Sequence, residues 1–217
     1  MTTAYADKSY VSLKRDLNNN LGRAGNSAIN WLNARPVYIS TKTSGFDQYS
    51  QIIELAVIDA DLNVLYHSQF LPSVPIDEEA QSMHGINLSS LQDRPTWSKA
   101  LPELRKLVAG RKIIMFNALF ETRVMQQSCI AFGEPIEWVD NLHINCAMYL
   151  AANGYGTDNR YGTASFEYAL LKAKVTGYSK TTGAVAANYA LAMLVKNIAQ
   201  YTIDINRGLQ ISLKVAS

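Results

Sequence analysis

The stretch from Val37 to Val64, VYISTKTSGFDQYSQIIELAVIDADLNV, constrains the fold of this chain more than any other part of the sequence. It opens on a short apolar run, Val37 to Ile39, and a second apolar run extends from Gln51 to Ile58. Between them, Thr43-Ser44-Gly45 supplies the small and polar residues of a tight loop. Two such runs joined by a loop predict strand, loop, strand, which is the beginning of a sheet.

The segment STKTSG, from Ser40 to Gly45, resembles the Asp-x-Glu-Thr-Thr-Gly motif of the DEDDh 3′-to-5′ exonucleases, the DnaQ and RNase T-like branch of the ribonuclease H-like fold. The resemblance continues in register from about Pro36 to Tyr201. It includes NALFE, which ends at Glu121, where the family has N-A-x-F-D, and GAVAAN, from Gly183 to Asn188, where the family has H-x-A-x-x-D. It implies an α/β fold whose mixed central sheet, three antiparallel strands plus parallel strands, is flanked by helices.

Residue patterns place the elements of this expected fold. We expect antiparallel strands at Val37–Ser40, Gln51–Ala60 and Asn63–Phe70, with Ile113–Phe116 joined parallel to the first strand. A further strand is predicted to end at Asp140. Apolar residues at helical spacing, followed in three cases by a glycine, predict helices at Thr96–Val108, Ala118–Phe132, Leu142–Ala152 and Ala184–Tyr201.

The resemblance implies that the residues which carry catalysis in the family have been replaced here. Family members use four acids to hold two divalent metals and a histidine to activate water. In this chain the acid positions are Ser40, Lys42, Glu121 and Asn188, and the histidine position is Gly183. One lysine and one glutamate leave those four positions with no net charge, so binding of Mg²⁺ or Mn²⁺ in the family's manner is disfavoured. We therefore expect no cofactor, and we expect Lys42 to take the place of a metal and pair with Glu121.

Two alternatives remain open at this stage. Displaced acids near the same elements can rebuild a metal site, and the candidates are Asp47, Glu54, Asp59, Asp61 and Asp140. Against this, Asp59 and Asp61 lie in a turn, where aspartate is favoured because it bonds to nearby backbone. The other alternative is an unrelated α/β fold, in which Gly45 only provides a turn with positive φ.

Three functions follow from a nuclease-like fold without its acids. The first is a catalytically degenerate exonuclease that binds single-stranded nucleic acid, or a strand end, without cleaving it. The residues that resemble the family's nucleotide cradle are Lys42, Thr43, Ser44, Phe46, Met83, His84, Asn117 and Phe120. The second is a structural or interaction protein that uses the fold as a scaffold. The third is an active metal-dependent 3′-to-5′ exonuclease with a rearranged site.

Composition separates the ends of the chain from its centre. We expect a basic N-terminal arm at 1–35, an exonuclease-like domain at 36–203 and a C-terminal extension at 204–217. The first 35 residues contain five bases and two acids, whereas the remainder contains 15 bases and 16 acids. Gly22 to Ser27 is predicted to be a loop and Ala28 to Asn33 a short helix, while alternating apolar residues near Arg207 predict an added strand or hairpin. The arm and the tail are the predicted protein-binding segments.

The two cysteines and the hydropathy bear on location. Cys129 and Cys146 have neither CxxC spacing nor a nearby histidine pair, which favours buried free thiols in a reducing cytoplasm. No apolar run reaches the roughly 20 residues of a membrane span, and residues 1–15 lack the apolar core of a secretory signal. We expect a cytoplasmic protein that does not contact a membrane.

Overall fold

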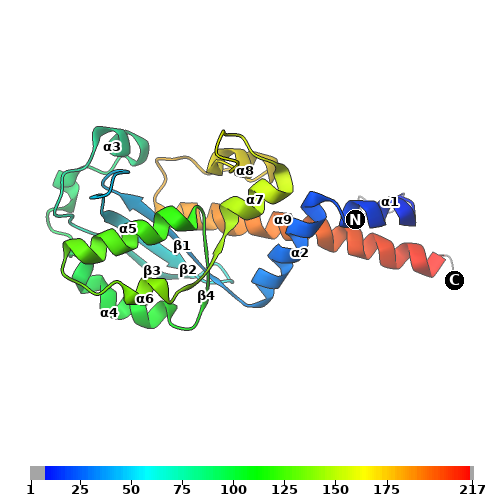
Figure 1. Ribbon diagram of the computed structural model, residues 1–217, viewed down its shortest axis with the longest axis horizontal. Coiled ribbons are helices and arrows are strands. Elements are labelled where there is room, and N and C mark those ends of the chain that lie inside the picture. The colour runs from blue at the N-terminus through cyan, green and yellow to red at the C-terminus, as the bar shows by residue number, and fades with distance from the viewer. Residues whose placement is uncertain (1–7, 216–217) are drawn as a thin grey trace. The chain divides into compact units, whose positions relative to one another are not determined.

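The computed structural model describes residues 8–215, so residues 1–7 of the arm and 216–217 of the tail lie outside the described residues. The chain forms two compact units. The first comprises the described parts of 1–34, 147–176 and 193–217, and the second comprises 35–146 and 177–192 (Figure 1). Each unit is described by itself.

The second unit is built on a five-stranded mixed sheet in the order β3-β2-β1-β4-β5. Its strands are β1 (Val37–Thr43), β2 (Ile52–Ile58), β3 (Val64–Gln69), β4 (Lys112–Met115) and β5 (His143–Cys146). β1, β2 and β3 are antiparallel neighbours, whereas β4 pairs parallel with both β1 and β5. The predicted mixed sheet is confirmed, including the parallel pairing that brings Ile113 beside Val37.

Alternation along β1 separates the two faces of this sheet. Val37 and Ile39 point to one face, where they are fully buried in a core with α4 (Trp97–Val108) and α5 (Ala118–Ala131). Figure 1 shows α4, α5 and the short α6 (Glu137–Asp140) together on that face. Further elements of this unit are α3 (Glu78–His84), the 3-10 turn η1 (Leu88–Leu91) and the beginning of α9 (Ala184–Val215). The even-numbered residues of β1 point to the opposite face.

The strand predicted to end at Asp140 is wrong, because Glu137–Asp140 forms the helical turn α6. Leu142–Ala152 is likewise not one helix: His143–Cys146 is β5, and α7 (Ala147–Tyr155) begins immediately after it. Short apolar runs fit a strand and a helix equally well, so periodicity cannot separate them. Pairing of β5 with all four residues of β4 decides the outcome.

The first unit is helical, with α1 (Tyr10–Leu17), α2 (Asn20–Asn33), α7, α8 (Phe166–Lys172) and most of α9. The loop predicted at Gly22 to Ser27 is wrong, since these residues belong to α2. The Asn19 side chain caps this helix by accepting from the Gly22 backbone N–H at 2.8 Å. Gly25 is needed for close helix packing, because a Cβ there would lie 2.0 Å from the Thr202 hydroxyl oxygen.

The strand or hairpin predicted near Arg207 is also wrong, because α9 continues as a helix to Val215. Ile205 and Leu209 are four residues apart and therefore lie on one helical face, where they pack against Leu13 of α1. Ile203, Ile211 and Leu213 are the exposed members of the alternating pattern. The burial of Ile205 and Leu209 on one face of the helix therefore outweighs the strand-like alternation of the sequence.

Both cysteines are free thiols, as expected, but only Cys129 is buried and Cys146 is half-buried. Cys129 is buried and accepts from the Trp97 indole N–H at 3.3 Å, and Cys146 accepts from the Ala118 backbone N–H at 3.4 Å. Among the helices of residues 8–215, none combines the length and the apolar character that a membrane crossing requires.

Candidate nucleic-acid site

The candidate site lies where β1 ends, beside the N-terminus of α5 and the beginning of α9, all within the second unit. Ser40 is paired with Ala56 of β2, and Lys42 is paired with Glu54, so these four residues share one face of the sheet. Thr41 points to the opposite face. The register shifts between Lys42 and Thr43, which marks a β-bulge where the strand passes into the loop.

Glu121, in the first turn of α5, is 9% exposed. One of its carboxylate oxygens accepts from the Thr41 hydroxyl at 2.7 Å. Burial raises the pKa of Glu121 to about 7, while the Thr41 hydrogen bonds and the Lys42 charge act in the opposite direction. A substantial fraction of Glu121 is therefore protonated at neutral pH, and the site holds less negative charge than the sequence indicates.

The structure gives Lys42 and Glu121 partners other than the expected ion pair. The Lys42 ammonium donates to the Lys180 backbone carbonyl at 3.2 Å, and Glu121 is bonded to Thr41. Lys42 and Thr41 are neighbours on a strand and so point to opposite faces, and Glu121 bonds to the residue on the face opposite to that of Lys42. The charge of Lys42 is still close enough to lower the pKa of Glu121 slightly.

Asn188 is fully buried in the first part of α9. Its amide nitrogen donates to the Ala56 backbone carbonyl at 2.8 Å, and Ala56 is the strand partner of Ser40. The Asn188 oxygen has no hydrogen-bond partner among the described residues. The side chain therefore presents a donor to β2, where a carboxylate would meet another oxygen.

Gly183 precedes α9 and lies against Glu54. A Cβ at position 183 would come within 2.8 Å of Glu54 Oε1. The Glu54 side chain is itself buried, and its Oε1 lies 2.7 Å from His67 Nε2. Glu54 thus occupies the space that a larger side chain at position 183 would need.

The loop after β1 is held by local hydrogen bonds. The Thr43 hydroxyl donates to the Gly45 carbonyl at 2.7 Å, and the Ser44 hydroxyl accepts from the Gln51 N–H at 2.9 Å. Gly45 does not have a positive φ. A Cβ there would lie 2.1 Å from a carboxylate oxygen of Asp77, so a larger residue would require the Asp77 side chain to move.

An aromatic pair lies beside this loop. Phe46 is 42% exposed, and its ring centroid lies 6.4 Å from that of Phe120. Sequence reasoning missed Arg123, whose guanidinium lies 5.3 Å from the Phe120 centroid and donates to the Phe46 carbonyl at 3.1 Å. One helical turn later, the Gln127 amide donates to the Asp47 carbonyl at 3.3 Å. The signal was available, because Phe120, Arg123 and Gln127 have the i, i+3, i+7 spacing of one helical face.

The remaining predicted cradle residues have mainly structural contacts. His84 Nδ1 accepts from the Ile86 N–H, and its Nε2 donates to the Thr43 carbonyl, each at 3.1 Å. Burial is the main cause that lowers the pKa of His84, so the imidazole is neutral and ties the end of α3 to β1. Met83 is half-buried next to it. Asn117 adopts a left-handed conformation with φ 54° and begins α5.

The acids considered for a rebuilt metal site are engaged elsewhere. Asp47 accepts from Ser50 and Tyr49, Asp59 from Asp61 and Asn63, and Asp140 from Gln126. Asp61 pairs with Arg35 at 2.5 Å. Residues 8–215 contain no group of three or more His, Cys, Asp or Glu side chains placed to hold a metal.

Ser40, Lys42, Glu121 and Asn188, the residues that the sequence resemblance places at the family's acid positions, do not fit a pair of divalent cations. They are a hydroxyl, an ammonium, a carboxyl group with a pKa of about 7 and an amide whose nitrogen is directed at β2. Divalent magnesium requires oxygen ligands, mainly ionised carboxylates.

Two relatives illustrate what this chain is similar to in sequence. No family model matches the chain. It is 27% identical over 134 residues to the uncharacterized exonuclease CP81 of Escherichia phage 186, covering 60% of this chain and 69% of that protein. It is also 27% identical over 131 residues to the DNA polymerase III epsilon subunit of Rickettsia typhi, covering 54% of this chain and only 57% of that subunit.

Solved structures with this architecture include exonucleases bound to nucleic acid or nucleotide. Exonuclease X in complex with 5′-overhanging duplex DNA has a TM-score of 0.54 at 19% identity, covering 78% of this chain and 98% of that one. The nuclease domain of 3′hExo, a DEDDh family member bound to rAMP, has a TM-score of 0.57 at 12% identity, covering 74% and 89%. These likenesses establish a ribonuclease H-like exonuclease fold.

Proposed function

We propose that the chain is a catalytically degenerate member of the DEDDh, DnaQ-like family of 3′-to-5′ exonucleases, and that it binds single-stranded nucleic acid, or a strand end, without cleaving it. The positions proposed to have lost their catalytic residues are Ser40, Lys42, Glu121, Gly183 and Asn188.

The contact of Asn188 carries the proposal. A metal-binding acid at this position would bring a carboxylate oxygen against the Ala56 carbonyl, which now accepts from the Asn188 amide at 2.8 Å. Burying a charge without a partner costs several kcal/mol. The local structure therefore suits an amide and opposes an acid.

Two further positions support loss of catalysis. Gly183 has no room for a histidine while Glu54 keeps its place. Lys42 adds a positive charge where the family's metals are expected, and two like charges about 4 Å apart repel even in water. Each change alone weakens a metal-dependent hydrolysis, and together they affect both the metals and the base.

Binding requires neither metals nor a general base. Single strands bind through base stacking on aromatic faces and through phosphate contacts, and stacking is typically worth about 1–3 kcal/mol per base. Phe46 offers a partly exposed ring, while Lys42 precedes the loop in β1 and Arg123 donates to the Phe46 carbonyl, so both bring positive charge close to the loop. Thr43 and Ser44 hold the loop that carries Phe46.

Fluorescence anisotropy with labelled DNA and RNA oligonucleotides, in the presence of a chelator, tests binding. We expect saturable binding of single strands, and Phe46→Ala should weaken it about tenfold or more. Tyr49→Ala is the matched control, because Tyr49 lies on the same loop, is 68% exposed and is outside the Phe46–Phe120 pair. Equal effects of the two substitutions, or no binding by the unmodified protein, would contradict the proposal.

A degradation assay with Mg²⁺ and Mn²⁺ tests the rival active exonuclease. We expect the labelled strand to stay intact. Metal-dependent shortening that persists in highly purified protein, and disappears in Glu121→Gln, would establish the rival.

One observation favours a protein-interaction role as the second candidate. Val11 on α1 and Leu213 on α9 are large apolar side chains that are 76% and 57% exposed, so each is available to a partner. A scaffold role predicts no oligonucleotide binding, together with a partner whose capture is abolished in Val11→Lys.

A further inference from the structure

We propose that the second unit has another binding site, a pocket at the beginning of β4 and β5 that takes a small organic anion with a flat apolar body. The pocket has a volume of about 310 Å³. That size lies at the lower end of the range for small-molecule sites. This inference does not depend on the proposed nucleic-acid site.

The pocket is remote from the candidate site along the sheet. Its lining includes Arg111, which precedes β4, and His143, the first residue of β5. The candidate site follows the other ends of the parallel strands, at Asn117 after β4 and at Thr43 in β1. A ligand in the pocket therefore leaves the candidate site open.

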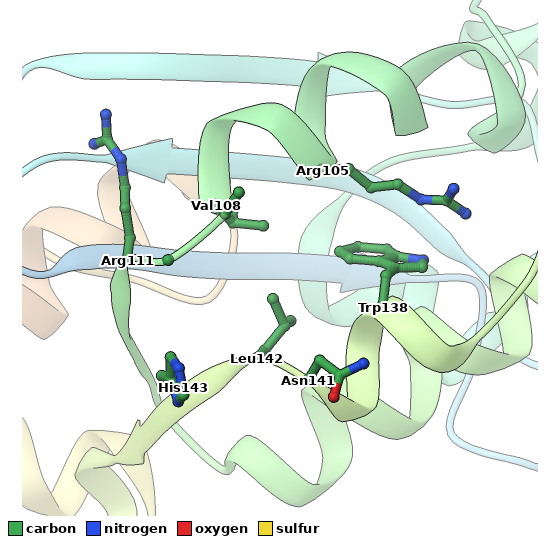
Figure 2. A pocket seen from close by; sticks show the side chains of 9 residues that line it. Arg105, Val108, Arg111, Trp138, Asn141, Leu142 and His143 are labelled. Carbon is green, nitrogen blue, oxygen red and sulfur yellow. The ribbon is translucent and has the colours of Figure 1, made fainter.

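The centre of the pocket is apolar. Figure 2 shows Val108 and Leu142 between two arginines, with the Trp138 ring below Arg105. The Arg105 guanidinium lies 5.5 Å from the centroid of that ring and donates to the Pro135 carbonyl at 3.4 Å. This arginine is thus fixed against the indole. A flat apolar body suits the space that these side chains line.

The charged groups that line the pocket are basic. They are Arg105 and Arg111, and no aspartate or glutamate is among the described residues of the lining. Glu134, outside the lining, lies 3.9 Å from Arg105 and offsets part of that charge. Arg111 extends at the other end of the pocket, and its guanidinium has five N–H donors suited to a carboxylate or phosphate. This charge arrangement selects an anion.

A nucleoside monophosphate and a bicyclic aromatic carboxylate share the required chemistry, so the two are separate arms of one titration. The full chain is titrated with thymidine monophosphate and with 2-naphthoate, and binding is followed by calorimetry. Thymidine and inorganic phosphate are the controls for the apolar body alone and for the anion alone. We expect saturable binding of at least one organic anion and at least tenfold weaker binding of both controls.

Variants assign the binding to the pocket. Arg111→Gln should weaken binding of the anion about tenfold or more, because it removes hydrogen bonds in which the donor and the acceptor are both charged. Ala109→Glu places an acid in the lining without removing any side chain that packs there, and it should abolish binding. Lys106→Gln is the matched control, because it also removes one positive charge, from an exposed position on α4 outside the lining, and should change nothing.

Several results would overturn the inference. These are the absence of saturable binding, equal affinity for thymidine or for inorganic phosphate, and equal weakening by Lys106→Gln and Arg111→Gln. Loss of binding in Lys42→Gln with retention in Ala109→Glu would place the anion at the candidate site instead. Circular dichroism of each variant confirms that it is folded.

Discussion

Gly183 lies directly against the Glu54 carboxylate, with room for a hydrogen but not for a Cβ, which would come 2.8 Å from Oε1. Glu54 is 4% exposed and bonded to His67, so its carboxylate has little freedom to move. Returning a histidine to position 183 therefore requires the Glu54 carboxylate to shift or to be removed.

This relationship predicts a strong coupling between the two positions. Gly183→His should lower the free energy of unfolding by about 1–3 kcal/mol, the usual cost of overpacking. In a Glu54→Ala background the same change should cost much less, so a double-mutant cycle by urea denaturation should give a coupling of at least about 1 kcal/mol. Additive effects would show that the two side chains do not compete for space.

Asn188→Asp should destabilise the protein by about 2–4 kcal/mol at neutral pH, since it replaces a donor to the Ala56 carbonyl with a buried carboxylate. Asn197→Asp is the matched control on the same helix. Its amide donates to the Ala173 carbonyl at the same 2.8 Å but is only partly buried, so the destabilisation should be smaller. Thermal and urea denaturation measure both, and equal destabilisation would contradict the argument from burial.

Glu121 predicts a pH dependence of stability. Its folded pKa is raised from 4.5 to about 7, so between these values the folded state holds a proton that the unfolded state has released. Below pH 4.5 the carboxyl group is protonated in both states and does not lower the free energy of unfolding. As pH rises from 4.5 toward 7, the free energy of unfolding falls by up to about 3 kcal/mol.

The substitution Glu121→Gln keeps the shape and the acceptor for Thr41 but cannot ionise. It should flatten the decline in unfolding free energy across this window and exceed the unmodified protein in stability above pH 7. Glu103→Gln, on the exposed side of α4, should leave the pH profile unchanged. If the slope of the Glu121→Gln variant matched that of the unmodified protein, Glu121 would be excluded as the titrating group.

The order of β1, β2, β3 and β4 could be predicted because β-branched runs, turn residues and motif order all agree. The helical tail could not be predicted, because its apolar residues fit both the alternation of a strand and the i, i+4 spacing of a helix. The contact of Ile205 and Leu209 with Leu13 favours the helix. Within the candidate site, sequence reasoning placed Lys42 and Glu121 in the right region but assigned them to each other. Their actual partners depend on strand faces and on the loop around Lys180, which no local pattern encodes.

Arg123 should bind a phosphate as well as hold the Phe46 loop. Removing one phosphate-binding cation lowers the slope of log affinity against log salt by about 0.7 for a single strand. Arg123→Gln should show this decrease in anisotropy titrations over a series of salt concentrations, whereas Lys106→Gln, at an exposed position on α4, should not. Weaker binding with an unchanged slope would leave Arg123 a purely positioning role.

Gly25 gives the sharpest test of why α2 contains glycine. If residues 22–27 were a flexible loop, Gly25→Ala would stabilise the protein by about 0.4–1 kcal/mol, since alanine restricts the unfolded chain. The structure predicts the opposite sign, because the new methyl group would lie 2.0 Å from the Thr202 hydroxyl and 2.9 Å from the Ile198 carbonyl. We expect a destabilisation of at least about 1 kcal/mol, against little change for Ser27→Ala, an exposed position on the same helix. Thr202→Ala should relieve part of the clash but not all of it, because the Ile198 carbonyl belongs to the backbone. A stabilising Gly25→Ala, measured by urea denaturation, would mean that α2 and α9 are not packed as closely as this structure shows.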